Sequence, residues 1–389
     1  MERIPGFSST GSKRPEALYG EAHPPGAPLR MTSASGCRVR DAQGREYVDF
    51  VMALGAVALG YGDARVTRAV QEAAAQGIVG PLSPVLEEQV AGRLAGLMPW
   101  VEQVRFLKTG AEAVAAAIRI ARVFTGRDRV IGCGYHGWLD GTQTSETAGV
   151  PEAVRAEYGT LRFSDPDDAR RCIGAAGDRL AAVIVEPVIE AAPSAEWLAA
   201  LRQATRSTGA VLIFDEIKTV GRVALGGAAE RWGGEPDLVV MGKAIANGMP
   251  LAAVGGRRDL MQAAIRTWIS STLATEFVSL AAADATLAAL AEDQVPRHLA
   301  RVGGELLAGF TQLADRHPAI IRRAAGIPEM CFLEFASGDL STAVVTGCAR
   351  RGVLFKRSAY NFVSLAHDER IVSDALAVLE DVLREVRGR

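Results

Sequence analysis

The sequence has no excess of charge of either sign. It carries 43 basic and 45 acidic residues among 389, for a formal net charge of −2. Proteins that bind nucleic acid usually concentrate basic residues on one face or in one segment. Blocks of like charge are absent too. We therefore expect a small-molecule ligand and no nucleic-acid partner.

A long hydrophobic run is also missing. A helix that spans a bilayer needs about 20 apolar residues. The longest candidate, residues 50–59, is short and contains Gly55. Residues 1–30 are polar and rich in proline and glycine, unlike the apolar core of a secretory signal. These features predict a cytoplasmic protein with no membrane partner.

Cysteine is scarce, and no two cysteines form a Cys-x-x-Cys pair. Scattered thiols of this kind match neither a disulfide framework nor a zinc site. We expect buried structural thiols and no metal site. The five positions are Cys37, Cys133, Cys172, Cys331 and Cys348.

Helical and apolar segments alternate through the middle of the chain. Apolar residues recur with helical spacing in residues 66–76, 85–97 and 111–124. Between and after them lie short runs rich in valine, isoleucine and leucine, at residues 104–107, 129–131, 182–185, 211–214 and 238–241. Continuous apolar strands that alternate with helices predict an α/β fold, with a mostly parallel sheet covered by helices on both faces.

Four segments follow from this pattern. Residues 1–30 form an irregular N-terminal arm, and residues 31–62 contain short strands with turns. Residues 63–290 form the large domain. Residues 291–389 mix helices with strand-like pieces at 330–335 and 361–364, and with residues 31–62 they predict a smaller α+β domain.

Two turns after predicted strands contain residues suited to a ligand. Open α/β sheets bind ligands at the carboxyl ends of their strands. Thr109, Gly110 and Ala111 lead from a strand into a helix, where free N–H groups suit a phosphate. Tyr135 and His136 lie on a glycine-flanked turn, where an aromatic ring could stack on a flat cofactor. An ordinary strand-to-helix turn and a packed aromatic corner are the structural alternatives.

Asp215 ends a fully apolar strand, where a charge is poorly solvated and needs a partner. A protonated pyridinium nitrogen is one such partner, and aspartate is the residue that recurs opposite it in pyridoxal phosphate (PLP) sites. Ile217 would face the same side as Asp215 if the extended conformation continues.

Lys243 follows the next apolar strand, directly after Gly242. A partly buried lysine loses its proton easily, as an amine that forms a Schiff base must. A lysine whose head reaches the surface is the alternative for an isolated example. Its position after the strand that follows Asp215 favours a catalytic role.

These motifs together resemble the class III aminotransferases of PLP fold type I, and within them the glutamate-1-semialdehyde aminomutase-like subgroup. The similarity extends from about residue 36 to the C-terminal helix. It is carried by Asp215-Glu216-Ile217, by residues 223–228, by Pro236-Asp237-Leu238 with Gly242-Lys243, and by residues 255–259.

The resemblance implies a role for each matching residue. Lys243 would form the Schiff base with PLP and move protons at the substrate, and Asp215 would hold the pyridine nitrogen. Tyr135 and Ile217 would contact the two ring faces, with His136 nearby. Gly110 and Ala111 would bind the phosphate. Thr272 matches a threonine that reaches the phosphate of the neighbouring subunit, which implies a homodimer with active sites at the interface. Glu186 matches a glutamate near the cofactor, although a structural role at a strand end is equally compatible.

Three departures from the family bear on the substrate. Ala111 replaces a hydroxyl residue of the phosphate loop. Ala53-Leu54-Gly55 replaces the aminomutase's Ser-Trp-Gly, and its C-terminal acid is missing near residues 358–364. Ser364 aligns close to a carboxylate-binding arginine, which leaves Lys356 and Arg357 as nearby cations. These changes favour a neutral carbonyl acceptor over glutamate-1-semialdehyde.

The predicted function is therefore an aminotransferase that passes an amino group from a donor to PLP and then to an aldehyde or ketone acceptor, by a ping-pong route. An aminomutase, racemase or decarboxylase would use the same cofactor. A non-catalytic PLP-binding protein is the alternative outside enzymes.

Overall fold

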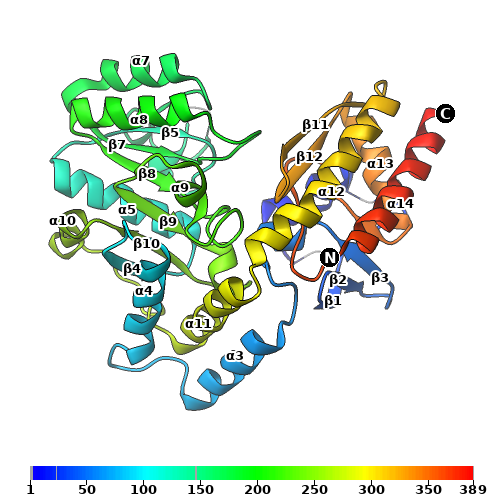
Figure 1. The fold of residues 1–389 in the computed structure, drawn as a ribbon, viewed down its shortest axis with the longest axis horizontal. Helices are drawn as coiled ribbons and strands as arrows, with labels where there is room; N and C mark the ends of the chain where they lie inside the picture. The colour runs from blue at the N-terminus through cyan, green and yellow to red at the C-terminus, as the bar shows by residue number, and fades with distance from the viewer. Residues whose placement is uncertain (1–2, 23, 145–146, 389) are drawn as a thin grey trace. The chain divides into compact units, whose positions relative to one another are not determined.

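The computed structural model describes residues 3–22, 24–144 and 147–388, which form two compact units. The larger is residues 64–294, and the smaller combines the described parts of residues 1–63 with residues 295–388. The two units are coloured along the chain in Figure 1. The predicted boundaries after residues 30, 62 and 290 stay our proposal for the domains.

The larger unit is built on one seven-stranded sheet. Four of its strands are buried along their whole length, as expected for strands covered on both faces. In sheet order the strands are β4 (Gln103–Leu107), β10 (Ala252–Gly256), β9 (Leu238–Met241), β8 (Val211–Asp215), β7 (Leu180–Val185), β5 (Arg129–Cys133) and β6 (Tyr158–Thr160).

Only β10 runs against its neighbours, so the prediction of a mostly parallel sheet is confirmed. The apolar pattern located β4, β5, β7, β8 and β9, and it missed β6 and β10. Strand β10 is rich in alanine and glycine and lacks the bulky β-branched residues by which strands are recognised in a sequence.

Helices cover both faces of this sheet. Helix α5 (Gly110–Thr125) packs on one face against β7, β8, β9 and β10, whereas α7 (Pro166–Ala176) and α8 (Ala195–Thr208) pack together on the other. The remaining helices of four or more residues are α3 (Ala64–Gln76), α4 (Val85–Leu97), α6 (Glu152–Arg155), α9 (Gly227–Trp232), α10 (Arg258–Met261) and α11 (Phe277–Glu292). Short 3-10 turns η2 to η5 lie at Asp140–Thr142, Gly177–Arg179, Lys243–Ala246 and Gln262–Arg266.

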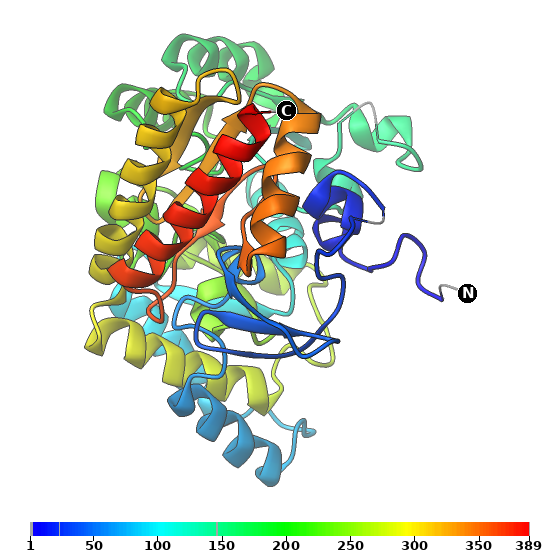
Figure 2. The same ribbon diagram turned by 90° about the vertical axis from the view of Figure 1, so that its right-hand side faces the viewer.

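The smaller unit contains two sheets. One orders β1 (Met31–Ser35), β2 (Arg38–Asp41), β3 (Glu46–Asp49) and β13 (Val353–Leu354), and the other orders β11 (Ile321–Ile327), β12 (Met330–Phe335) and β14 (Asn361–Phe362). In Figure 2 helix α14 (Glu369–Arg387) lies between α12 (Val295–Arg316) and α13 (Gly338–Arg350), and it contacts both.

The N-terminal segment is more ordered than the irregular conformation predicted for it. It forms a 3-10 turn, η1 (Gly11–Lys13), and helix α1 (Pro15–Tyr19). Pro15 occupies the first helical turn, and Gly20 ends the helix with a φ of 86°. Tyr19 is buried with residues of α13 and donates a hydrogen bond to the Pro28 carbonyl at 2.9 Å.

A left-handed turn, α2 (Met52–Gly55), stands out in this unit. Three consecutive non-glycine residues have positive φ angles, at 45°, 50° and 60°, before Gly55 at 84°. Each such residue costs about 1–2 kcal/mol, so the turn holds strained backbone. A Cβ atom at Gly55 would lie 2.8 Å from the Phe362 ring, which explains why glycine ends the turn.

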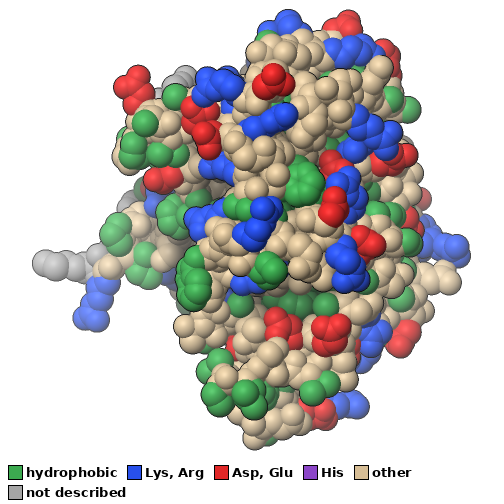
Figure 3. Space-filling model, turned by 90° about the vertical axis from the view of Figure 1, so that its left-hand side faces the viewer, with side chains coloured by type: hydrophobic (Ala, Val, Ile, Leu, Met, Phe, Trp, Pro, Cys, Tyr) green, Lys and Arg blue, Asp and Glu red, His purple; other side chains and the backbone are tan. Residues whose placement is uncertain are grey.

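Charged side chains cover the surface in mixed order. Figure 3 shows lysine and arginine next to aspartate and glutamate over one face. Among the described residues, no helix is long and apolar enough to cross a membrane.

Candidate active site

The predicted site residues gather at one edge of the large sheet. Thr109 follows β4, Tyr135 follows β5, Glu186 follows β7, Asp215 ends β8 and Lys243 follows β9. These five strands run in the same direction. Their carboxyl ends therefore share an edge, which is where open α/β sheets bind ligands.

Asp215 is held by two hydrogen bonds. Its Oδ2 lies 2.8 Å from Nδ1 of His136, and its Oδ1 accepts from the Ile217 backbone N–H at 3.2 Å. Both the aspartate and the histidine are buried. Nε2 of His136 is also buried and has no hydrogen-bond partner within the described ranges. The pair therefore presents an oriented carboxylate backed by an imidazole.

Lys243 begins the 3-10 turn η4 with a φ of 51°, in the left-handed region where a lysine is strained. Its side chain is half-buried, and in the described part of the chain its ammonium has no hydrogen bond or ion pair. Burial and then the nearby Lys218 ammonium lower the pKa of Lys243 to about 8. Because this pKa lies much nearer to neutral pH than the usual lysine value of 10.5, a far larger fraction of this amine is neutral and nucleophilic than for an exposed lysine.

Glu186 joins the β5 turn to the segment after β8. Its Oε1 accepts from the Tyr135 backbone N–H at 2.5 Å, and its Oε2 pairs with the Lys218 ammonium. A Cβ atom on Gly134, which has a φ of 105°, would come within 2.8 Å of the Glu186 side chain. The Tyr135 ring is 72% exposed, so the packed aromatic corner considered as an alternative is not formed.

The start of helix α5 lies against the same residues. A Cβ atom on Gly110 would lie 2.5 Å from Cδ1 of Ile217, and one on Gly137 would lie 2.6 Å from Cβ of Ala111. Ile217 reaches this position from a turn, because the extended conformation stops at Asp215. The turn after β4, the turn after β5 and the segment after β8 are thus packed together.

The Thr109 hydroxyl has a structural task. It accepts from the Glu112 N–H at 3.2 Å, while the Glu112 carboxylate accepts from the Thr109 N–H at 2.9 Å, which forms a capping box. The N–H groups of Gly110 and Ala111 have no acceptor among the described residues. An anion at this helix start would therefore meet backbone donors.

Comparison with known proteins identifies the family. Residues 20–383 match the family model for aminotransferase class-III. The chain belongs to this family. A glutamate-1-semialdehyde 2,1-aminomutase from Thermomicrobium roseum is 34% identical, over 92% of this chain and 91% of the relative.

Solved structures agree with this class III aminotransferase fold. FumI protein from Sphingopyxis sp. MTA144, determined with PLP, superposes with a TM-score of 0.93 at 26% identity, over 99% of this chain and 94% of that one. An omega-transaminase from Sphaerobacter thermophilus gives a TM-score of 0.88 at 27% identity, over 99% and 95% of the two chains. The prediction of PLP fold type I is confirmed.

The residues at this sheet edge suit PLP, the cofactor of the class III family. The cofactor needs an amine for its aldehyde, an anion for its ring nitrogen and donors for its phosphate. Lys243 supplies an amine of lowered pKa, Asp215 supplies an oriented carboxylate, and Gly110 and Ala111 supply backbone donors. When bound, PLP stabilises negative charge that develops on the substrate.

Thr272 is not brought to this cluster within one chain. It is exposed, in the loop between η5 and α11, and among the described residues no hydrogen bond joins it to the other site residues. Its predicted role toward a neighbouring subunit stays a prediction.

Sequence reasoning missed Lys218. Its side chain is only 13% exposed and pairs with Glu186 inside the cluster. The signal was present, since it is the third residue after Asp215, but a lysine in a turn is usually solvated.

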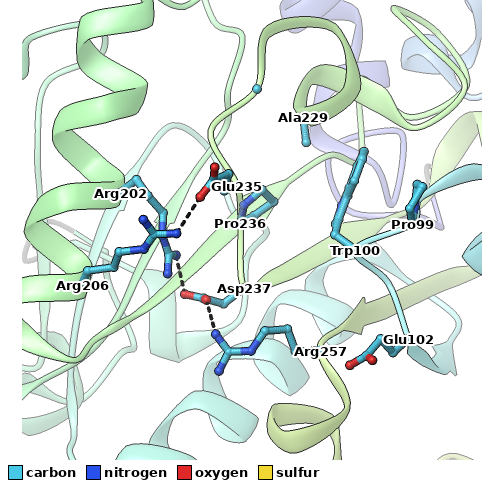
Figure 4. Close-up of a pocket in the computed structure, with 11 residues that line it drawn as sticks. Pro99, Trp100, Glu102, Arg202, Arg206, Ala229, Glu235, Pro236, Asp237 and Arg257 are labelled. Carbon is cyan, nitrogen blue, oxygen red and sulfur yellow. Dashed lines mark hydrogen bonds and ion pairs between the residues drawn. The ribbon is translucent and has the colours of Figure 1, made fainter.

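A cavity of about 520 Å³ lies at the amino end of β9, away from Lys243 (Figure 4). Asp237 accepts from Arg202 at 2.8 Å and from Arg257 at 2.9 Å, and Arg206 pairs with Glu235 at 2.6 Å. Each arginine that lines it already has a carboxylate partner. We interpret these contacts as ion pairs that fix the strand starts.

The close approach of Gly110 to Ile217 predicts the effect of a single methyl group. Gly110→Ala should displace Ile217, lower the free energy of unfolding by about 1–3 kcal/mol and weaken PLP binding. Gly96→Ala is the matched control, because nothing lies within 4 Å of a Cβ there and helix α4 should gain about 0.5–1 kcal/mol. Denaturant unfolding and PLP titration measure both effects. Equal changes in the free energy of unfolding and in PLP affinity for the two variants would contradict the contact between Gly110 and Ile217.

Proposed function

We propose that this class III enzyme is an aminotransferase that moves an amino group from a donor amine to an aldehyde or ketone, with Lys243 as its catalytic amine. The observation that carries the proposal is the half-buried Lys243, whose pKa is lowered to about 8, at the strand edge shared with the Asp215–His136 pair. A neutral amine can attack the cofactor's aldehyde and later remove a proton from the bound substrate.

The other site residues have supporting roles in this proposal. Asp215 keeps the ring nitrogen protonated because a buried carboxylate favours the adjacent positive charge. His136 orients that carboxylate, and Tyr135 and Ile217 contact the two faces of the ring. Gly110 and Ala111 bind the phosphate through backbone N–H groups, since Ala111 has no hydroxyl and that of Thr109 caps the helix.

Two observations favour a neutral acceptor over a carboxylate-bearing one. Ser364 is fully buried, and its hydroxyl lies 3.0 Å from Nδ1 of His367, so it is committed to a contact inside the smaller unit. Lys356 is buried too, and its ammonium donates to the Ser12 carbonyl at 3.2 Å. Neither Ser364 nor Lys356 is therefore available to a substrate carboxylate, and of the two nearby cations only the half-buried Arg357 stays a candidate.

The second candidate is intramolecular amino transfer. It is favoured by relatives named glutamate-1-semialdehyde 2,1-aminomutase that are 30–34% identical over more than 90% of this chain. It is disfavoured by Ala53-Leu54-Gly55 and by the absence of an acid from residues 358–364.

A spectroscopic experiment separates the two. The enzyme is first loaded with an amino group from a donor amine, and a keto acid or aldehyde is then added. An aminotransferase regains the PLP spectrum in proportion to the acceptor and releases an aminated product. Conversion of glutamate-1-semialdehyde to its isomer, with no acceptor dependence, would establish the aminomutase instead.

Replacement of Lys243 should abolish turnover and the absorbance band of the enzyme-linked cofactor. Lys243→Ala should lower turnover by at least about a hundredfold and remove the absorbance band of the enzyme-linked cofactor. Lys13→Ala, an exposed lysine in the smaller unit, should change neither. Steady-state kinetics and absorbance spectra measure the two effects. A Lys243→Ala protein that kept the band and full turnover would refute the assignment.

We also propose that the enzyme works as a homodimer. Large apolar side chains of the larger unit are exposed in residues 78–85 and 265–273, which is typical of an interface. The start of helix α11, just after the second segment, is joined to the first segment, because the Phe277 N–H donates to the Ile78 carbonyl at 2.8 Å. The most exposed are Leu82, Val85, Ile265 and Trp268, at 75–81%.

Disruption of this surface should dissociate the enzyme. Trp268→Glu should convert the dimer to monomers in sedimentation velocity, because a buried unpaired carboxylate is costly. Activity should fall in parallel if Thr272 serves the partner's site. Met31→Glu, at an exposed residue of the smaller unit, is the control and should remain dimeric. A wild-type monomer at micromolar concentration would exclude the proposal.

A further inference from the structure

Lys218 occupies an unusual environment for a lysine. Its side chain is 13% exposed, and its ammonium pairs with the carboxylate of Glu186, which is 6% exposed. Glu186 already accepts a hydrogen bond from the Tyr135 N–H. Taking both charges out of water is expensive unless the pair has a function or excellent compensation.

The loop that carries Lys218 contacts the residues on both sides of Lys243. Ile217 lies against Gly242, because a Cβ atom there would be 3.7 Å from the isoleucine side chain. Four residues later, a Cβ atom on Gly221 would lie 3.8 Å from Cβ of Ala244. Lys218 therefore lies in a loop that touches the residues on both sides of Lys243.

This loop is firmly held. The Glu216 N–H donates to the Val240 carbonyl at 2.9 Å, which joins the loop to β9. The buried Glu216 carboxyl accepts from the Ala228 and Ala229 N–H groups, both at 2.8 Å, and from the Thr219 hydroxyl. Burial raises the pKa of Glu216 to about 7, and its hydrogen bonds limit that rise. The position of Lys218 is thus set by the fold.

Four charged groups act on the Lys243 amine. Lys218 and Arg222 are cationic, and both come from the loop after β8. Glu186 and Asp215 are anionic, and Asp215 is engaged with His136. Helix α11 packs on η4, and the buried residues of α11 include none that is charged. Strand β10 contributes only alanine, valine and glycine.

We propose that Lys218 is a positioning residue for the catalytic amine: the Lys218 ammonium, fixed by Glu186, disfavours a second positive charge on Lys243 and so increases the neutral, nucleophilic fraction of that amine. The inference rests on Lys243 being the catalytic amine of the proposed function. Two like charges in a poorly solvated site repel each other, so the fixed Lys218 ammonium favours the neutral form of Lys243.

The signs of the charges make the proposal testable. Burial is the largest cause of the lowered pKa of Lys243, and Lys218 comes next with the same sign, whereas Glu186 acts in the opposite direction. Removing the Lys218 charge should therefore raise the pKa of Lys243, and removing the Glu186 charge should lower it. A general change in the burial or folding of the site would not produce this pair of opposite shifts.

The experiment uses the full chain freed of cofactor. A trace of acetic anhydride is reacted with the protein at a series of pH values, and mass spectrometry of the Lys243 peptide gives the pKa of that one amine. Lys218→Met should raise it by about one unit or more. Lys218→Arg keeps the charge and should leave it unchanged, and Glu186→Gln should lower it. Circular dichroism checks that each variant is folded.

Several outcomes would overturn the proposal. An unchanged pKa in folded Lys218→Met, or shifts of the same sign in Lys218→Met and Glu186→Gln, would do so. If Lys218→Met does not fold, the Lys218→Arg and Glu186→Gln variants still test the proposal. An unchanged pKa of Lys243 in Glu186→Gln would contradict it. A separate experiment tests the proposed function: added PLP should protect Lys243 from acetylation. A failure of the proposed function is therefore distinguished from a failure of the Lys218 role.

Discussion

A carboxylate at the end of a fully buried strand is shielded from water. The contact between Asp215 and His136 compensates for the hydration that this carboxylate loses. The 2.8 Å contact joins the ends of β8 and β5 across β7, and it orients the carboxylate toward the open edge of the sheet. Glu186, at the end of the intervening strand, ties the same turns together through the Tyr135 N–H and Lys218. The site is thus a set of charges that the parallel strands carry to one edge and that stabilise one another there.

Close backbone packing is the second requirement of this arrangement. Gly110 and Gly137 bring the start of α5 against Ile217 and the turn after β5, with no room for a side chain. The free N–H groups of α5 are thereby placed beside the charged residues. The capping box of Thr109 and Glu112 fixes where that helix begins.

Much of this could be predicted from the sequence, and the limits have physical causes. Strands such as β8 and β9 are continuous apolar runs bounded by polar residues, and Asp215 and Lys243 were identifiable because each ends such a run. Strand β10 was missed because alanine and glycine have little strand preference. Short strands such as β6 and β13 depend on tertiary pairing rather than on local pattern.

Side-chain partners were harder to predict than positions. The capping role of the Thr109 hydroxyl was missed, although Thr109 and Glu112 have the Thr-x-x-Glu spacing of a capping box. The contact of Lys218 with Glu186 joins residues from different strand ends, and the His136–Asp215 contact does the same. The role predicted for Thr272, toward a neighbouring subunit, stays a prediction.

The pairing of β9 with antiparallel β10 has a consequence for how the chain folds. Met241 pairs with Ala253, so the loop that carries Lys243 is closed by the most local strand pairing of its sheet. Strand β4, which leads into Gly110, joins the sheet through β10 and is its most distant pairing in sequence. Local contacts close at a small entropic cost and distant ones at a larger cost. Lys243 and Gly110 are therefore held by the most local and the most distant pairings of the same sheet, and a ligand that bound both would stabilise the completed fold over every partly assembled form.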